Sequence, residues 1–191
     1  MIASFIMISL DGFFEGDKPW DIDWHRTDEE FNEFAAEQLD EFATLVFGRA
    51  TYEGMAQYWR SEEAIKSDPE IAGRMNQAQK IVVSRTLQKP EPAWSNTTLV
   101  RDVTELGSHE NLLVLGSAVL TTSLLEAGLL DELRIMVNPV LIGSGPEAFG
   151  AAQLAVPVGP GETVTNRSDA IEVSKDDFAF RVTYRYSISY E

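Results

Sequence analysis

Short blocks of apolar residues alternate along this chain with longer stretches in which apolar positions recur every three or four residues. Blocks of β-forming residues with little polar alternation are typical of strands that are covered on both faces. Such blocks predict strands at residues 2–9, 45–47, 80–84, 97–100, 112–115 and 133–142. Residues 13–25 combine Gly, Pro and Asp with two tryptophans, and this composition predicts an irregular loop.

Helical spacing is clearest between the first two predicted strands. One helical face there carries Phe31, Phe34, Ala35, Leu39 and Phe42. The preceding sequence Thr27-Asp-Glu-Glu30 matches a capping box that would begin the helix at Thr27. Further helices are predicted at residues 52–59, after Ser67-Asp-Pro69, within 101–111 and after Ser117.

Strands that alternate with helices predict an α/β fold with a largely parallel sheet. The segment 178–188 alternates apolar and polar residues, which predicts a final, partly exposed antiparallel strand. Residues 151–170 are predicted to be irregular or to form a poorly restrained hairpin. No internal repeat or linker interrupts the sequence, so we expect one domain that spans residues 1–191.

The charge balance narrows the range of partners. With 31 acidic against 15 basic residues the net charge is −16, which disfavours nucleic acid and anionic membranes as partners. The chain has no cysteine and only two histidines, so we expect neither thiolate chemistry nor a metal site. No apolar run reaches the roughly 20 residues that span a bilayer, and the N-terminus lacks a basic leader. We therefore expect a soluble, cytoplasmic protein that acts on a small molecule.

Three predicted strands end in residues suited to binding phosphate. The strand at 112–115 runs into Gly116-Ser117 and a helix, so the turn exposes backbone N–H groups at the positive end of a helix dipole. Gly48-Arg49-Ala50-Thr51 repeats this pattern, and Ser84-Arg85-Thr86 follows a third strand. Because the carboxyl ends of parallel strands meet at one edge, these turns can converge on one dinucleotide. A hydroxyl beside a guanidinium, as at Ser84-Arg85, suits an extra phosphate such as the 2′-phosphate of NADPH.

Each motif also has an ordinary structural explanation. Gly116-Ser117 fits any strand-to-helix turn, Arg49 fits a solvated surface residue, and Ser84-Arg85 fits a common strand exit. The sequence contains neither a Gly-x-Gly-x-x-Gly fingerprint nor a Walker loop. The ordered occurrence of all three motifs, in a chain with few basic residues, favours the nucleotide site.

Several motifs, taken in order, resemble those of the dihydrofolate-reductase-like superfamily. They are Ser9-Leu-Asp-Gly12, Phe47-Gly-Arg-Ala-Thr-Tyr-Glu53, Val82-Val-Ser-Arg-Thr86, Gly116-Ser117, Leu129-Leu-Asp-Glu-Leu133 and Pro139-Val-Leu-Ile-Gly-Ser-Gly145. The branch that they most resemble is the reductase domain at the C-terminus of the bifunctional riboflavin-biosynthesis deaminase/reductase. The resemblance implies a three-layer fold with a mixed, mostly parallel central sheet and an antiparallel C-terminal strand.

The resemblance also implies an NADPH-dependent reductase of a small heterocyclic or sugar-linked substrate, similar to the 5-amino-6-(5-phosphoribosylamino)uracil reductase domain. It implies a homodimer. The residues that would contact the cofactor pyrophosphate are Gly48, Arg49 and Thr51, and those at the 2′-phosphate are Ser84 and Arg85. The other side of the cofactor would be lined by Gly116, Ser117, Ala118 and Val119, with Met7, Ile8 and Asp11 near the nicotinamide and substrate.

The chain departs from its relatives at two positions of interest. Ala118 stands where relatives commonly carry a second glycine. The carboxylate with which dihydrofolate reductases handle the pterin proton has no clean counterpart among Asp23, Asp28, Glu29 and Glu30. The sequence also shows neither a deaminase domain nor a basic cluster for a sugar phosphate. The resemblance therefore supports a reductase more firmly than it supports any named substrate.

Asp11 is the candidate acidic group beside the reacting centre, and the alternative is an Asp-Gly turn residue. Candidate walls of the substrate pocket are Trp20, Phe31, Tyr52 and Trp59, with plain core packing as the alternative for each. Three other functions stay open: an NADPH-binding sensor or scaffold without turnover, a divergent dihydrofolate reductase, and a small-molecule binder that uses no nucleotide.

Overall fold

The computed structural model describes residues 1–90, 92–149, 158–160 and 182–188. Within these ranges, eight strands form one sheet in the order β4-β3-β2-β5-β1-β6-β8-β7. The strands are β1 (Ile2–Ser9), β2 (Thr44–Gly48), β3 (Gln79–Val83), β4 (Thr97–Val100), β5 (Leu112–Leu115), β6 (Glu132–Asn138), β7 (Val158–Pro160) and β8 (Val182–Ile188). Strands β1 to β6 are parallel to one another, whereas β8 pairs antiparallel with β6 and with β7.

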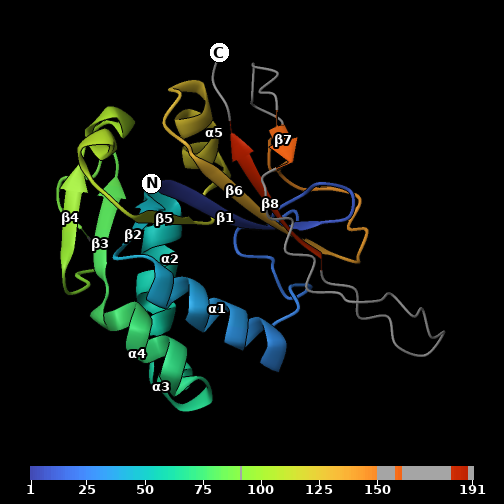
Figure 1. Ribbon diagram of the computed structural model, residues 1–191. Helices are drawn as coiled ribbons and strands as arrows, with labels where there is room; N and C mark the ends of the chain where they lie inside the picture. The colour runs from blue at the N-terminus through green and yellow to red at the C-terminus, as the bar shows by residue number, and fades with distance from the viewer. Residues whose placement is uncertain (91, 150–157, 161–181, 189–191) are drawn as a thin grey trace.

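Helices cover both faces of this sheet, which gives three layers (Figure 1). One face carries α1 (Glu29–Glu41), α2 (Arg49–Trp59) and α4 (Pro69–Gln77), with the short α3 (Glu62–Ser67) packed against α2 and α4. The other face carries the 3₁₀ helix η1 (Val103–Ser108) and α5 (Ala118–Glu126). The α/β class and the mostly parallel sheet expected from the sequence are confirmed. None of the described helices is long and apolar enough to span a membrane.

The central strand β1 explains why its sequence is continuously apolar. Ala3 and Phe5 belong to the core beneath α1 and α2, while Ile2 and Ile6 belong to the core beneath α5. A strand that is covered on both faces needs apolar residues at successive positions. Burial weakens toward the carboxyl end, where Met7 and Ile8 are only partly buried. This end of the sheet is therefore less completely covered than the middle.

Three local predictions need correction. Helix α1 is capped by Asp28 and not by Thr27, because the Asp28 carboxylate accepts a hydrogen bond from the Phe31 N–H at 3.0 Å. Strand β6 ends at Asn138, since Pro139 has no N–H with which to continue the ladder. Helix α3 was not predicted. The irregular segment predicted at 151–170 lies outside the described residues except at 158–160, and so do residues 178–181 of the last predicted strand.

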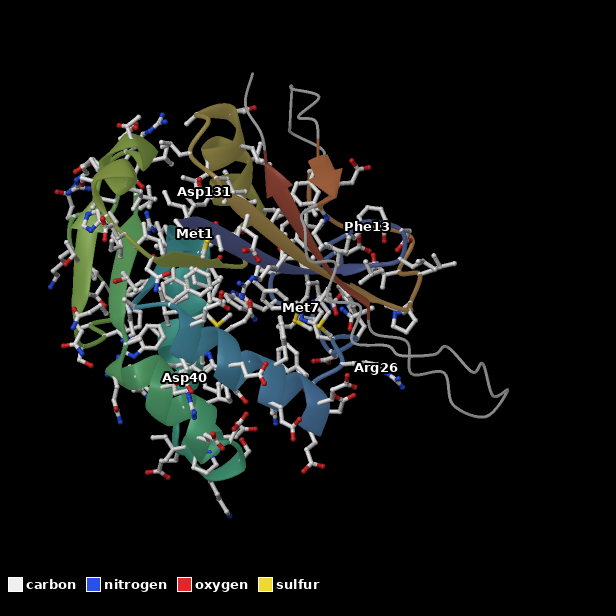
Figure 2. All side chains as sticks on the ribbon, in the orientation of Figure 1. Met1, Met7, Phe13, Arg26, Asp40 and Asp131 are labelled. Atoms are coloured by element: carbon white, nitrogen blue, oxygen red, sulfur yellow. The ribbon has the colours of Figure 1, made fainter. Side chains whose placement is uncertain are left out.

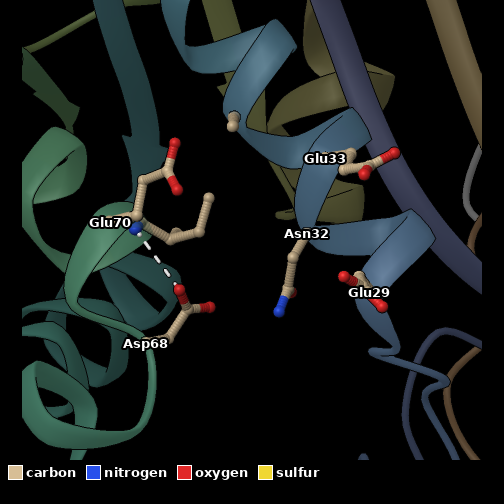
Figure 3. A pocket seen from close by; sticks show the side chains of 7 residues that line it. Glu29, Asn32, Glu33, Asp68 and Glu70 are labelled. Atoms are coloured by element: carbon tan, nitrogen blue, oxygen red, sulfur yellow. Dashed lines mark hydrogen bonds between the residues drawn. The ribbon is translucent and has the colours of Figure 1, made fainter.

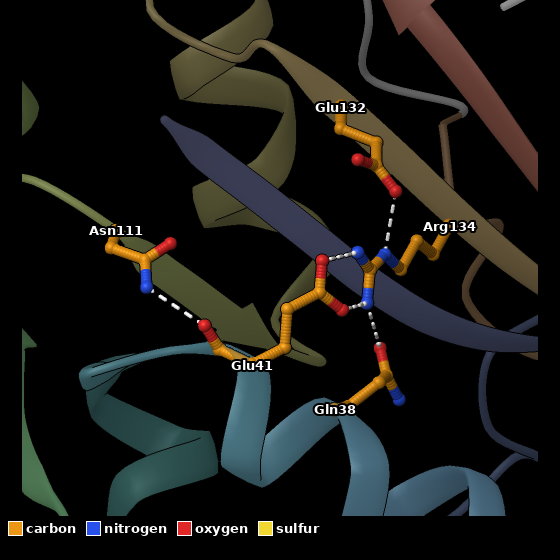
Figure 4. Close-up of polar contacts among 5 residues, drawn as sticks. All are labelled: Gln38, Glu41, Asn111, Glu132 and Arg134. Carbon is orange, nitrogen blue, oxygen red and sulfur yellow. Dashed lines mark hydrogen bonds and ion pairs between the residues drawn. The ribbon is translucent and has the colours of Figure 1, made fainter. Parts of the chain in front are cut away.

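A buried arginine joins β6 to α1 (Figure 4). The side chain of Arg134 is fully buried, and its guanidinium donates to both carboxylate oxygens of Glu41, at 2.8 and 2.7 Å, and to Glu132 at 2.6 Å. Burial alone would lower the pKa of Arg134, but the hydrogen bonds that its guanidinium donates to Glu41 and Glu132 outweigh burial and raise the pKa. The cluster fixes the register of α1 against the sheet.

A second buried cation lies at the amino end of β3. The Lys80 ammonium donates to the carbonyl oxygens of Asn76, Ala78 and Ser95 and lies 4.5 Å from the centroid of the Trp94 ring. Two of these carbonyls belong to the C-terminus of α4, where a cation is favoured by the helix dipole. Desolvation nevertheless lowers the pKa of Lys80 to about 8.

Candidate functional site

The carboxyl ends of β1 to β6 lie along one edge of the sheet, and the candidate site lies at this edge. The neighbouring strands β2 and β5 are followed by helices on opposite faces, α2 on one and α5 on the other. In open α/β sheets a crevice forms at such a switch point and commonly binds the ligand. The geometry therefore directs attention to the turns after β2 and β5.

These two turns are in direct contact. A Cβ placed on Gly48 would overlap Ser117 Oγ, and one placed on Gly116 would come within 3.5 Å of Thr51 Cγ2. Gly116 and Ser117 both adopt positive φ angles, of 60° and 57°, so the chain enters α5 through two left-handed residues. The structure thus brings together the Gly48 and Gly116 motifs, which in the sequence share only their position between a predicted strand and a helix.

The helices that start at these turns differ from the others. Helices α1, α3, α4 and η1 are capped by the side chains of Asp28, Ser61, Asp68 and Asp102, and each has an acidic residue in its first turn. No described side chain caps α2 or α5, and neither has an acidic residue in its first turn. Two sets of helix N–H groups are thus left for a ligand, and the nearby protein charge does not oppose an anion.

Arginines surround the same region of the edge. The Arg49 guanidinium donates to Glu53 at 2.8 Å and to the Thr86 hydroxyl at 3.3 Å, so it spans from α2 to the turn after β3. Arg85 is 86% exposed and its guanidinium lies 4.0 Å from Asp102. Ser84 is buried and its Oγ accepts a hydrogen bond from the Leu87 N–H. The arrangement places two arginines beside the uncapped start of α2, each with a carboxylate nearby: Glu53 for Arg49 and Asp102 for Arg85.

Arg101 is a cation at this edge that the sequence analysis did not single out. Its guanidinium donates to the carbonyl oxygen of Ser84 at 3.1 Å and to that of Leu87, so it holds the turn that carries Arg85. The signal was present in the sequence, because Arg101 directly follows a predicted strand just as Arg49 follows another. It was hidden by the polar stretch that comes after it.

Asp11 links the loop that follows β1 to the loop that follows β6. Its carboxylate accepts hydrogen bonds from the N–H groups of Ile142, at 3.3 Å, and Gly143, at 2.8 Å. A side-chain hydrogen bond from Ser9 and these backbone N–H groups lower the pKa of Asp11. A carboxyl with a lowered pKa is ionised at neutral pH and donates no proton. The geometry therefore favours the turn role that the sequence had left as the alternative.

Two of the four proposed pocket walls lie near the candidate site. Trp20 is 43% exposed, has a φ of 65°, and packs so closely on α2 that a Cβ on Gly54 would overlap its indole. Phe31 lies in the first turn of α1 and packs against the same core as Met7. In Figure 2, Met7 lies on the side of β1 toward α1, and its side chain is partly buried. Ile8 packs on the opposite face, against the core beneath α5.

The other two proposed walls are corrected by the structure. Tyr52 is completely buried between Phe47 and Trp94, and its hydroxyl donates to the carbonyl oxygen of Pro92 at 2.9 Å. It is a core residue that anchors the loop before β4. Trp59 is the last residue of α2, about 15 Å along the helix from Arg49. It therefore lies toward the opposite edge of the sheet.

A separate groove of about 250 Å³ lies between α1 and α4 (Figure 3). Its lining includes Glu29, Glu33, Asp68 and Glu70, together with Asn32. The four carboxylates oppose a phosphorylated ligand. In the part of the chain that the structure describes, no group of three or more His, Cys, Asp or Glu residues has the geometry of a metal site.

Known proteins are similar to this chain in sequence and in fold. The model of the RibD C-terminal domain family matches residues 1–179. A relative named YyaP, from Bacillus subtilis (strain 168), is 28% identical over 150 residues, covering 75% of this chain and 77% of the relative. A putative riboflavin biosynthesis protein from Shewanella sp. PV-4 superposes with a TM-score of 0.68 at 20% identity, covering 99% of both chains.

A second solved structure is dihydrofolate reductase from Enterococcus faecalis complexed with NADP(H) and RAB-propyl. It superposes with a TM-score of 0.57 at 19% identity, covering 98% of this chain and 96% of the other. At these identities the likeness to both structures establishes the fold, which is of the dihydrofolate-reductase type. Together with the family match over residues 1–179, this fold confirms the resemblance inferred from the ordered motifs.

Proposed function

Because the chain belongs to the RibD C-terminal domain family, we propose that it is an NADPH-dependent reductase of a small heterocyclic or sugar-linked substrate. The observation that carries the proposal is the junction of α2 and α5. Two uncapped helix N-termini meet there across the contact between Gly48 and Ser117, with arginines beside them. The dihydrofolate reductase with this fold was solved with NADP(H), which supports the same class of cofactor here.

The residues present fit a phosphorylated dinucleotide. The N–H groups at the starts of α2 and α5 would bind the pyrophosphate, and the Thr51 hydroxyl would add a donor. The exposed guanidinium of Arg85 would bind the 2′-phosphate, on a turn that Arg101 holds in place. Met7 and Ile8 are the partly buried residues of β1 toward the site, and they would contact the nicotinamide. When bound, NADPH supplies the hydride, and the protein orients it.

The cofactor proposal is tested by fluorescence titration of the full chain with NADPH and NADH. We expect NADPH to bind more tightly, and Arg85→Ala to remove roughly tenfold of that preference, as expected for one exposed charge-assisted contact. Arg60→Ala is the matched control, because Arg60 is an exposed arginine at the other end of α2. An unchanged preference in Arg85→Ala would show that the 2′-phosphate binds elsewhere.

A binding protein without turnover is the second candidate, and the contacts of Asp11 favour it. The carboxylate expected to lie beside the reacting centre is ionised and engaged by two backbone N–H groups. The Asp11→Asn variant distinguishes a reductase from a binding protein without turnover. The measurements are the rate of NADPH oxidation in the presence of an electron-poor heterocycle and the affinity for NADPH. A catalytic Asp11 predicts a much larger fall in turnover than in NADPH affinity. Equal losses of turnover and of NADPH affinity would show that Asp11 serves only to hold the two loops together.

A further inference from the structure

The turn after β3 and the first residues after β4 lie side by side at the carboxyl edge of the sheet. Strands β3 and β4 are parallel neighbours, and the Ser84 N–H donates to the carbonyl oxygen of Val100 at 3.0 Å. The guanidinium of Arg101 donates back to the carbonyl oxygens of Ser84, at 3.1 Å, and Leu87. These bonds hold the turn that carries Arg85 against the residues that lead into η1.

Asp102 is fixed on this second segment with one carboxylate oxygen toward Arg85. Its Oδ1 accepts hydrogen bonds from the N–H of Thr104 at 3.1 Å and from the Thr104 hydroxyl at 2.9 Å. Its Oδ2 lies 4.0 Å from the Arg85 guanidinium, a separation longer than a hydrogen bond. The bonds from Thr104 and the charge of Arg85 lower the pKa of Asp102, so the carboxylate is ionised at neutral pH. Both side chains are exposed, so a ligand at this turn would meet a cation and an anion together.

The adenosine half of a dinucleotide bound at the junction of α2 and α5 would extend over this pair. The junction lies between β2 and β5, and β3 and β4 follow β2 on the side away from β1. Because Met7 and Ile8 of β1 are proposed to contact the nicotinamide, the adenosine would lie toward β3 and β4. The Arg49 guanidinium connects the two regions, since it stands at the start of α2 and donates to the Thr86 hydroxyl at 3.3 Å.

The cation and the carboxylate favour different nicotinamide cofactors. A guanidinium binds the 2′-phosphate that distinguishes NADPH from NADH. A carboxylate accepts a hydrogen bond from the free 2′-hydroxyl of NADH and repels a 2′-phosphate. The alternative is that Asp102 only orients Arg85, in which case loss of its charge would weaken the binding of NADPH. The two roles therefore predict changes of opposite sign.

We propose that Asp102 is a specificity-determining residue of the cofactor site, whose Oδ2 accepts the ribose 2′-hydroxyl of NADH and opposes the 2′-phosphate of NADPH beside Arg85. This inference rests on the proposed function, because it assigns a second recognition group to the same cofactor site. The two side chains act against each other. The chain therefore binds both cofactors, and its preference for NADPH is smaller than Arg85 alone would give.

The test compares the unmodified full chain with Asp102→Asn in fluorescence titrations with NADPH and NADH at one fixed ionic strength. Asparagine removes the charge but keeps a side-chain oxygen that can cap η1, so thermal unfolding should change little. We expect NADPH to bind about threefold more tightly, because one exposed and screened like charge is removed. We expect NADH to bind about threefold more weakly, because a charged acceptor becomes a neutral one.

Glu53→Gln is the matched control. Glu53 also places a carboxylate beside an arginine, 2.8 Å from Arg49, but this arginine stands at the start of α2, where the proposed ligand is the pyrophosphate. Both cofactors contain the pyrophosphate. The substitution should therefore change the affinities for NADPH and NADH by the same factor.

Two results with Asp102→Asn would overturn the inference: equal changes in the affinities for NADPH and NADH, or weaker binding of NADPH. Asp102→Ser repeats the measurement with another uncharged capping residue, so a folding defect in one variant does not decide the outcome. An unmodified chain that binds neither cofactor would refute the proposed function itself. Binding of NADPH with an unchanged ratio of the two affinities in Asp102→Asn would refute only the role of Asp102.

Discussion

Glu41→Gln is expected to destabilise the fold by about 3 kcal/mol, because it removes the negative charge that faces a fully buried guanidinium. Arg134 is fully buried and donates to both carboxylate oxygens of Glu41, so the substitution leaves a desolvated guanidinium with less compensating charge. Breaking a buried pair from one side typically costs about 3–5 kcal/mol. Two features place the expected loss at the lower end of that range: the contact with Glu132 at 2.6 Å remains, and the Glu41 side chain is 38% exposed, so solvent screens part of its charge.

The assay is urea unfolding, followed by tryptophan fluorescence and circular dichroism on the same samples. We expect the midpoint to fall while the slope stays constant, since a change in slope would indicate a different denatured state. Asp40→Asn is the matched control. Asp40 also receives two guanidinium hydrogen bonds, both at 2.9 Å from Arg74, but this pair lies on the surface. Solvent screens an exposed pair, so the control should lose much less stability.

The triple variant Glu41→Gln/Glu132→Gln/Arg134→Met provides the sharper result. Replacing the buried cation with an apolar side chain, and both of its carboxylate partners with amides, leaves no uncompensated charge in the cluster, so the triple variant should be at least about 1 kcal/mol more stable than Glu41→Gln alone. The reasoning would be refuted if the triple variant were less stable than Glu41→Gln. It would also be refuted if Glu41→Gln and Asp40→Asn cost the same.

Two further predictions concern the edge of the site and the pH dependence of stability. Gly48→Ala should destabilise the protein by about 1–3 kcal/mol and weaken NADPH binding, because a Cβ there overlaps Ser117 Oγ. Ser117→Gly in the same chain should recover both losses in thermal unfolding and NADPH titration, and no recovery would contradict the contact. Lys80 has a pKa of about 8 in the fold against 10.5 unfolded, so its charged form is disfavoured by folding and stability rises as pH increases through this window. Lys80→Met should flatten that rise by about 3 kcal/mol in urea unfolding from pH 8 to 10.5, and parallel curves for the two proteins would exclude Lys80 as the cause.

The sequence predicted the fold well where local pattern and tertiary packing agree. The helical spacing from Phe31 onward and the Asp68-Pro69 cap both appear in the structure, since each depends only on residues close in sequence. Tyr52 and Trp59 show the limit. Both are aromatic residues on α2, and the sequence does not say which side of the helix, or which end of the sheet, each one occupies. That information comes only from how α2 packs on the sheet.

The site was predictable in outline for a related reason. Turns that follow parallel strands are brought to one edge by topology alone, so the Gly48 and Gly116 motifs had to be neighbours once the strand order placed β2 beside β5. The position of the loop before α1, in contrast, depends on a contact between residues more than a hundred positions apart, the hydrogen bond from the Arg26 N–H to Asn138. No local signal marks such contacts.

The distribution of acidic residues connects the fold with the proposed function. With a net charge of −16, a randomly chosen helix start is expected to carry an acidic residue, and α1, α3, α4 and η1 do. Such residues stabilise a helix N-terminus by capping it and by opposing the dipole. Helices α2 and α5 forgo this stabilisation at the one place where they meet. An anionic ligand would restore it, so NADPH should raise the melting temperature of the protein, and by less in Gly48→Ala, where the two turns are forced apart.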